Sequence, residues 1–300
     1  MAKPPPLLME ETNMLVEQLM NGLGQGMIYA LMSLGYALIY GVVGLVTFAH
    51  GDVIMLGAFA AYYTFSLVSG NLLAALLAGF LVSGLMGFVV HRVCYNRFFS
   101  APRQISLICT IGMGMFLRNL VQVVAGTETK PIPDLFGSGA ITFAGLRITY
   151  MQCFIFAVVL VLAGLLTLFL NRTRAGLSLR AVSMDKTASA MVGINTRRAT
   201  TIGNMIGCGI AGISGVLLAM YYGTITPMMG GTIGMKSFCC AVLGGMSSIW
   251  GAAIGGILIG VFENLGIMVF SAGMRDIISF VFLVLVLLVK PEGLFARRSK

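Results

Sequence analysis

The sequence has very little charge for its length. Asp, Glu, Lys and Arg make up only 10% of the 300 residues, whereas 58% of the residues are hydrophobic. Soluble domains carry about 25% charged residues, so this composition excludes a soluble globular protein. We therefore predict an all-α integral membrane protein, folded as a polytopic helical bundle.

The motifs of catalysis and nucleotide hydrolysis are also missing. The sequence holds two histidines, no GxxxxGK[ST] phosphate loop, and no Ser/His/Asp, HExxH or CxxC arrangement. Its six cysteines lie in or beside apolar stretches without metal-type spacing. We predict that the chain is not an enzyme, holds no metal or cofactor, and depends on another chain for any ATP hydrolysis.

The basic residues do not form a single patch. The net charge is +9, but Lys and Arg fall between apolar segments, where they indicate cytoplasmic loops beside lipid. This distribution excludes nucleic acid as a partner.

Apolar runs divide the chain into membrane-crossing segments, each needing about 20 residues. The glycine-rich stretch 234–270 is too long for one span and is either two spans or a re-entrant pair, so we expect eight to ten transmembrane or re-entrant helices. The other predicted spans are 21–43, 52–70, 71–91, 104–125, 150–170, 199–222 and 274–290. Residues 1–20 are expected to form an interfacial lead-in, 21–290 the transmembrane domain, and 291–300 a tail.

Loop charges predict the orientation. Residues 92–103, 171–198 and the tail 291–300 are rich in Arg and Lys, so we place them in the cytoplasm. The loop 126–149 has nearly balanced charge and belongs on the opposite side, as the number of spans requires.

Glycine is abundant, at 39 residues. Pairs such as Gly22/Gly26 and Gly256/Gly260 are typical of close helix packing in lipid. The denser cluster LGGMSSIWGAAIGG favours unwound backbone near a cavity.

The long basic loop contains a short predicted helix. Asp185 is a good N-cap, and Gly193 is a typical C-terminal stop. The run between them presents a modestly apolar surface suited to docking in a partner's groove, although a helix that touches only lipid headgroups is the alternative. The segment comprises Asp185, Lys186, Ala188, Ala190, Met191, Val192 and Gly193.

Four ordered motifs carry a family resemblance over roughly residues 15–297: TFAHGDVIMLGAF, RAVSMDKTASAMVGIN, GMKSFCCAVLGGMSSIWGAAIGGILIG and KPEGLF. Together they resemble the permeases of branched-chain amino-acid (LIV-type) ABC importers. The family commonly has Asn where this chain has Thr47, and a polar, often uncharged, residue where it has Arg118.

The resemblance implies a function and a set of partners. It implies an inner-membrane permease that pairs with a second, homologous permease, two cytoplasmic ATP-binding subunits and an extracytoplasmic solute-binding protein. The helix at 185–193 is then expected to couple the permease to the ATPase. Similar systems move urea or short amides, so the solute stays open, and a self-sufficient carrier or channel is the second class of function.

The stretch GLVTFAHGDVIMLGAF places ionisable groups between apolar runs. Asp52 is expected to cap the helix that follows it, where its charge favours the helix N-terminus. Thr47, His50 and Asp52 are candidates for a broken segment that borders the solute pathway, with a purely structural cap as the alternative.

Three further charges lie in apolar segments. Arg118 and Glu263 are expected either to pair or line one polar cavity of the pathway, or to reach an interface separately. Lys236 is expected to anchor its segment at the headgroups or to attract a carboxylate.

Overall fold

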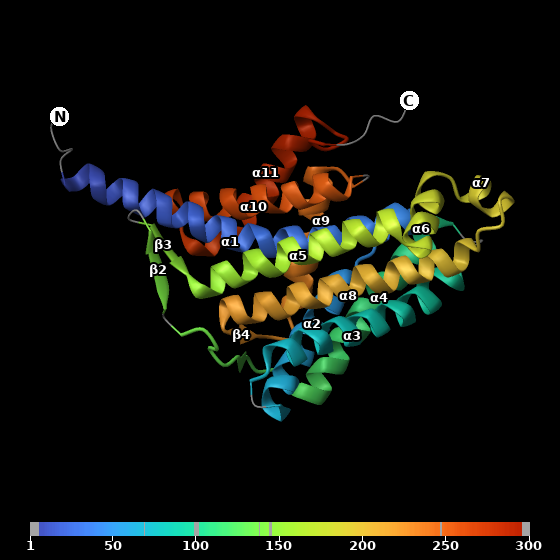
Figure 1. The fold of residues 1–300 in the computed structure, drawn as a ribbon, viewed down its shortest axis with the longest axis horizontal. Helices are drawn as coiled ribbons and strands as arrows, with labels where there is room; N and C mark the ends of the chain where they lie inside the picture. The colour runs from blue at the N-terminus through green and yellow to red at the C-terminus, as the bar shows by residue number, and fades with distance from the viewer. Residues whose placement is uncertain are drawn as a thin grey trace.

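The computed structural model describes residues 6–68, 70–98, 102–137, 139–143, 146–246 and 248–295 (Figure 1). Its long helices are α1 (Pro6–Val43), α2 (His50–Leu67), α3 (Leu72–Val90), α4 (Arg103–Ala125), α5 (Tyr150–Arg172), α8 (Thr196–Tyr222), α9 (Met229–Gly244), α10 (Ile249–Val269) and α11 (Arg275–Val289). The shorter helices are α6 (Arg174–Met184), α7 (Lys186–Met191), the π-helical turn η1 (His91–Asn96) and the 3-10 turn η2 (Ala272–Met274). The strands are β1 (Lys130–Pro131), β2 (Ala140–Phe143), β3 (Leu146–Thr149) and β4 (Thr224–Ile225).

The predicted fold class, a polytopic helical membrane protein, is confirmed. Six helical segments are long and apolar enough to cross a bilayer: Met14–Val43, Leu72–Asn96, Gln104–Ala125, Tyr150–Arg172, Thr196–Tyr222 and Ile249–Val269. Their outer faces carry bare aliphatic side chains, such as Leu81, Val123 and Leu160, each more than 60% exposed. A soluble monomer does not leave such a surface uncovered, whereas lipid tails cover it well.

Helix α1 lies at the centre, packed against α8 and α10. Its residues from Met27 to Leu34 are almost fully buried. Glycines make these packings possible: a methyl group on Gly260 of α10 would overlap the backbone of Gly26, and one on Gly35 would overlap the backbone of Gly207 in α8. The small-residue spacing therefore does mark close helix packing, as predicted.

The chain turns back into the bundle after α1 ends. Gly44, at a φ of +72°, lies beside Lys186. The Thr47 backbone N–H then donates to the Tyr36 hydroxyl at 3.3 Å, and the His50 ring nitrogen Nε2 lies 3.3 Å from the Met32 carbonyl. Met32 precedes the end of α1 by eleven residues, about 16 Å at the rise of an α-helix, so α2 begins inside the bundle.

Two of the basic stretches and the described part of the tail lie at one end of the molecule. Lys186 and Arg197 share a cavity with His91 and Ser106, and Arg180 shares another with Trp250. The Phe295 N–H donates to the Gly244 carbonyl nearby. The tail's basic residues Arg297, Arg298 and Lys300 lie outside the described residues, as do residues 1–5 of the predicted lead-in.

The opposite end carries the strands (Figure 1). Within 126–149, β2 and β3 form an antiparallel hairpin with Ala140 opposite Thr149. Strand β1 pairs with β4, with Lys130 opposite Ile225, and so joins this loop to the segment between α8 and α9.

The stretch 234–270 is divided between two helices, as predicted, but α9 has 16 residues and α10 has 21, so α9 is shorter than the about 20 residues of a full span. Two other segments differ in detail from the sequence prediction. The loop 171–198 contains α6 as well as the predicted short helix; Thr173 caps α6 by accepting from the Gly176 N–H. Helix α1 runs without a break through residue 20.

Candidate functional site

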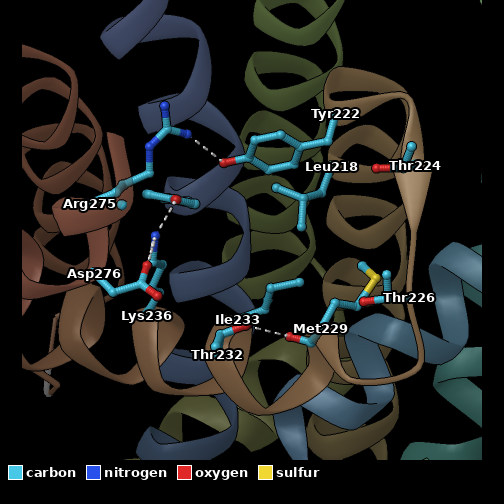
Figure 2. Close-up of a pocket in the computed structure, with 12 residues that line it drawn as sticks. Leu218, Tyr222, Thr224, Thr226, Met229, Thr232, Ile233, Lys236, Arg275 and Asp276 are labelled. Carbon is cyan, nitrogen blue, oxygen red and sulfur yellow. Dashed lines mark hydrogen bonds and ion pairs between the residues drawn. The ribbon is translucent and has the colours of Figure 1, made fainter. Parts of the chain in front are cut away.

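A cavity of about 490 Å³ lies between the end of α8 and the beginnings of α9 and α11. It is at the strand-bearing end of the bundle, because β4 contributes to its wall. Figure 2 shows Lys236, Arg275 and Asp276 on one side, with Thr224, Thr226 and Met229 on the other. We call it the charged cavity; its lining comprises Tyr29, Leu218, Tyr222, Thr224, Thr226, Met229, Thr232, Ile233, Lys236, Gly273, Arg275 and Asp276.

Lys236 stands between two carboxylates. Its Nζ is 2.5 Å from Glu263 Oε1 and 2.7 Å from Asp276 Oδ1. Glu263 is fully buried, whereas the side chain of Asp276 is 50% exposed. The expectation that Lys236 anchors its segment at the headgroups is therefore wrong, because the lysine is buried in an ion-paired network.

Polar side chains complete the network around Glu263. Its carboxylate accepts hydrogen bonds from Gln25 Nε2 at 2.9 Å, Tyr29 at 2.9 Å and Ser279 at 2.7 Å. These donors come from α1 and α11, so the buried carboxylate joins α1, α9, α10 and α11. A buried charge persists only with such partners.

The expected pairing of Arg118 with Glu263 is wrong. Arg118 pairs with Asp52 instead: Nε is 3.1 Å from Oδ1 and Nη2 is 3.3 Å from Oδ2. Both members are close to α9, because a methyl group on Gly230 would meet Asp52 and one on Gly231 would meet the guanidinium. This bidentate geometry joins α2 to α4.

Asp52 does not cap its helix, so that prediction is also wrong. Helix α2 begins two residues earlier, with Ala49 in the N-cap position and no side-chain cap. The carboxylate still lies in the first turn, near the positive end of the helix, but its hydrogen bonds come from Arg118. Thr47 and His50 are buried at 5% and 1% exposure, and neither lines the charged cavity.

The predicted short helix is present as α7. Asp185 Oδ1 accepts from the Thr187 N–H at 2.7 Å and the Ala188 N–H at 3.0 Å, which confirms the N-cap. Gly193 follows the C-cap residue at a φ of +86°. The apolar side chains of Met191 and Val192 are 83% and 77% exposed, at the end of the molecule in Figure 1 that lies away from the strands.

Lys186 connects α7 to the central helix. Its ammonium donates to the Val43 carbonyl at 2.5 Å, one of the carbonyls that lack a partner at the end of α1. A cation is also favoured there by the helix dipole. The short helix is thus attached directly to the longest helix of the bundle.

Sequence reasoning missed several members of the charged cavity. Arg275 donates to the Tyr222 hydroxyl at 3.1 Å, and the same hydroxyl accepts from Gln25 at 2.9 Å. One available signal was the pair Arg275-Asp276 directly before the last apolar run, since charges at that position have to be wetted or paired. Within the described residues, no group of three or more His, Cys, Asp and Glu side chains is placed to hold a metal ion.

Comparison with known proteins agrees with this architecture. The profile of the family described as "Branched-chain amino acid transport system / permease component" matches residues 18–287. The branched-chain amino acid permease BraD of Pseudomonas aeruginosa is 38% identical over 294 residues, covering 94% of this chain and 96% of BraD. LivH of Escherichia coli K12 is 38% identical over 296 residues, with the same coverage of both chains.

A solved structure shares the fold. A chain of PsaBC from Streptococcus pneumoniae, determined in complex with Fab, superposes with a TM-score of 0.52 at 13% identity, and the match covers 91% of each chain. The family profile extends over most of the sequence, and the curated permeases match it almost end to end. The chain therefore belongs to the permease-component family of branched-chain amino acid transport systems.

Proposed function

We propose that this chain is the inner-membrane permease subunit of an ABC importer that carries branched-chain or related hydrophobic amino acids. A second, homologous permease completes the pathway, and two cytoplasmic subunits bind and hydrolyse ATP. A solute-binding protein delivers the amino acid at the strand-bearing end. The family membership supports this proposal, and BraD and LivH are both named as high-affinity branched-chain amino acid permeases.

The exposed surface of α7 is the observation that carries the coupling role. Ala188, Ala190, Met191 and Val192 are all exposed, although Ala188 and Ala190 flank the buried Ser189. Apolar side chains on a capped helix at the end of a membrane bundle suit a partner's groove. We assign this surface to the ATP-binding subunit.

A motion of α7 has a direct route into the bundle. Lys186 donates a hydrogen bond to the Val43 carbonyl at the C-terminal end of α1, and Tyr29 on the same helix lines the charged cavity at the strand-bearing end of the bundle. The C-terminal end of α1 thus lies at the coupling surface, and Tyr29, earlier in the same helix, lies at the cavity. Alternating access requires two states that differ in their contacts with the solute, and α1 connects α7 to the wall of this cavity.

Val192→Asp tests the coupling role. A carboxylate on this exposed side chain leaves α7 folded but places an unpaired charge in the proposed groove, so we expect ATPase stimulation and amino-acid uptake to fall at least about tenfold. The matched control is Thr127→Asp, an exposed position at the opposite end of the molecule. Unchanged uptake in reconstituted importer carrying Val192→Asp would contradict the docking of α7.

A second measurement separates the importer from a self-sufficient carrier or channel. The chain alone in liposomes, without ATP or partner chains, should take up no labelled leucine. Uptake under those conditions would favour the carrier.

A further inference from the structure

The ion pairs within the charged cavity leave one cation and one anion without a full counter-charge. Lys236 contacts both Glu263 and Asp276, and the fully buried Glu263 already balances its charge. Arg275 and Asp276 then remain as one cation and one anion, adjacent in the sequence and facing the same space (Figure 2).

Both of these groups have bonding capacity left. Among the described residues, Arg275 has no carboxylate within ion-pairing distance; the hydrogen bond given for its guanidinium is to the Tyr222 hydroxyl. A guanidinium carries five N–H donors, and a carboxylate has about four acceptor positions. Asp276 contacts Lys236 through Oδ1 and keeps half of its side chain exposed.

The rest of the wall is apolar or hydroxylic. Leu218 from α8 and Met229 and Ile233 from α9 present aliphatic surface, and Thr226 stands at the edge opposite the charges (Figure 2). The volume of about 490 Å³ is within the range of small-molecule sites.

We propose that the charged cavity binds the zwitterion of an amino acid with an aliphatic side chain. Arg275 receives the α-carboxylate, Asp276 receives the α-ammonium, and Leu218, Met229 and Ile233 surround the side chain. This assignment rests on the proposed function and gives it a specific site.

The charge pair also distinguishes between solute classes. A neutral amide can hydrogen-bond to Arg275 and Asp276 but brings no opposite charge, so both groups would lose water without gaining an ion pair. Charge-assisted hydrogen bonds are about twice as strong as neutral ones. The cavity therefore favours amino acids over urea or short amides.

The assignment is tested with ligands that lack one charged group and with protein variants that lack the matching charge. Isoamylamine is leucine without its carboxylate, and isocaproate is leucine without its ammonium. Binding of L-leucine, isoamylamine and isocaproate to the full chain in nanodiscs can be titrated by ligand-observed NMR. Variants Arg275→Gln and Asp276→Asn are compared with Lys130→Gln and Glu128→Gln, which change charges at the same end outside the cavity.

Each variant should lose affinity only for ligands that carry the matching charge. Arg275→Gln should weaken leucine and isocaproate about 10-fold to 100-fold and leave isoamylamine unchanged, because a charge-assisted hydrogen bond has this weight. Asp276→Asn should weaken leucine and isoamylamine and spare isocaproate. The spared ligand in each case shows that the cavity is still folded.

Three results would overturn the inference: no leucine binding to the unaltered chain, equal loss of all three ligands, or leucine affinity within about twofold of the unaltered chain in both variants. Leucine uptake by the assembled importer tests the proposed function separately. If the importer takes up leucine but the variants do not discriminate between the three ligands, the assignment of the cavity is rejected and the permease role stands. If the variants discriminate between the ligands but the assembled importer shows no ATP-dependent uptake, the binding site stands and the importer function is rejected.

Discussion

Replacing Glu263 by glutamine should destabilise the bundle more than any single surface change. The carboxylate is fully buried and accepts hydrogen bonds from Lys236, Ser279, Tyr29 and Gln25 at 2.5–2.9 Å. Glutamine keeps the size and one acceptor oxygen, but it removes the negative charge and points an N–H₂ group toward donors. Among the described carboxylates, Lys236 is then left with Asp276.

The expected size of the effect follows from two limits. Breaking a buried ion pair in soluble proteins costs about 3–5 kcal/mol, whereas a hydrogen bond between helices in a bilayer averages about 0.6 kcal/mol. Because Asp276 remains as a partner for Lys236, we expect Glu263→Gln to lower the free energy of unfolding by about 2–3 kcal/mol. Lys236→Met leaves Glu263 without a cation and should cost about 3 kcal/mol.

The double variant isolates the ion pair. Glu263→Gln with Lys236→Met removes both charges, so the combined loss should be smaller than the sum of the single losses by about 2 kcal/mol. Unfolding can be measured in mixed dodecylmaltoside–SDS micelles by circular dichroism, with fluorescence of the single tryptophan, Trp250, as a second probe. Glu128→Gln, an exposed acid, is the matched control. Losses that add to within about 0.5 kcal/mol would refute the reasoning, because independent sites behave in that way.

Three further outcomes are expected. Arg118→Met should cost about 2 kcal/mol of unfolding free energy because it leaves Asp52 buried without its cation, and adding Asp52→Asn should recover about half; a double variant as unstable as the sum would argue against the pair. Gly51→Ala should abolish stable insertion, since its methyl group would overlap the backbone of α9, whereas Gly112→Ala, which meets nothing within 4 Å, should express normally; equal membrane yields on immunoblots would contradict that packing. Val192→Cys, expressed without the ATP-binding subunits, should react with a membrane-impermeant maleimide in inside-out vesicles above the level of the unaltered chain, and not in intact cells; added labelling of intact cells would reverse the orientation.

Hydrophobic runs and caps were sufficient to predict much of the architecture. Each needs only local sequence: a bilayer sets the span length, and the Asp185 cap and Gly193 stop define α7 within nine residues. The common end predicted for the stretches 92–103 and 171–198 also agrees with the structure.

Partners across the bundle could not be predicted in the same way. Arg118 is 66 positions from Asp52 in sequence, and Glu263 is 27 from Lys236. Which charges meet depends on which helices are neighbours, and hydrophobic periodicity does not carry that information. The cap proposed for Asp52 failed for a related reason: three residues before it, from Ala49, already have helical geometry or lie within α2, so its carboxylate was available to a distant arginine.

The glycine contacts of α1 divide the molecule mechanically. Where Gly26 meets Gly260 and Gly35 meets Gly207, backbones touch without an intervening layer of side chains that could slide or compress. Helices α1, α8 and α10 therefore form one rigid unit. Helix α11 contacts this unit differently, because the space beside Gly266 is filled by the flexible side chain of Ile278. We expect α11 to rotate relative to the rigid unit, so that Arg275 and Asp276 at its start change position while Leu218 on α8 stays in place.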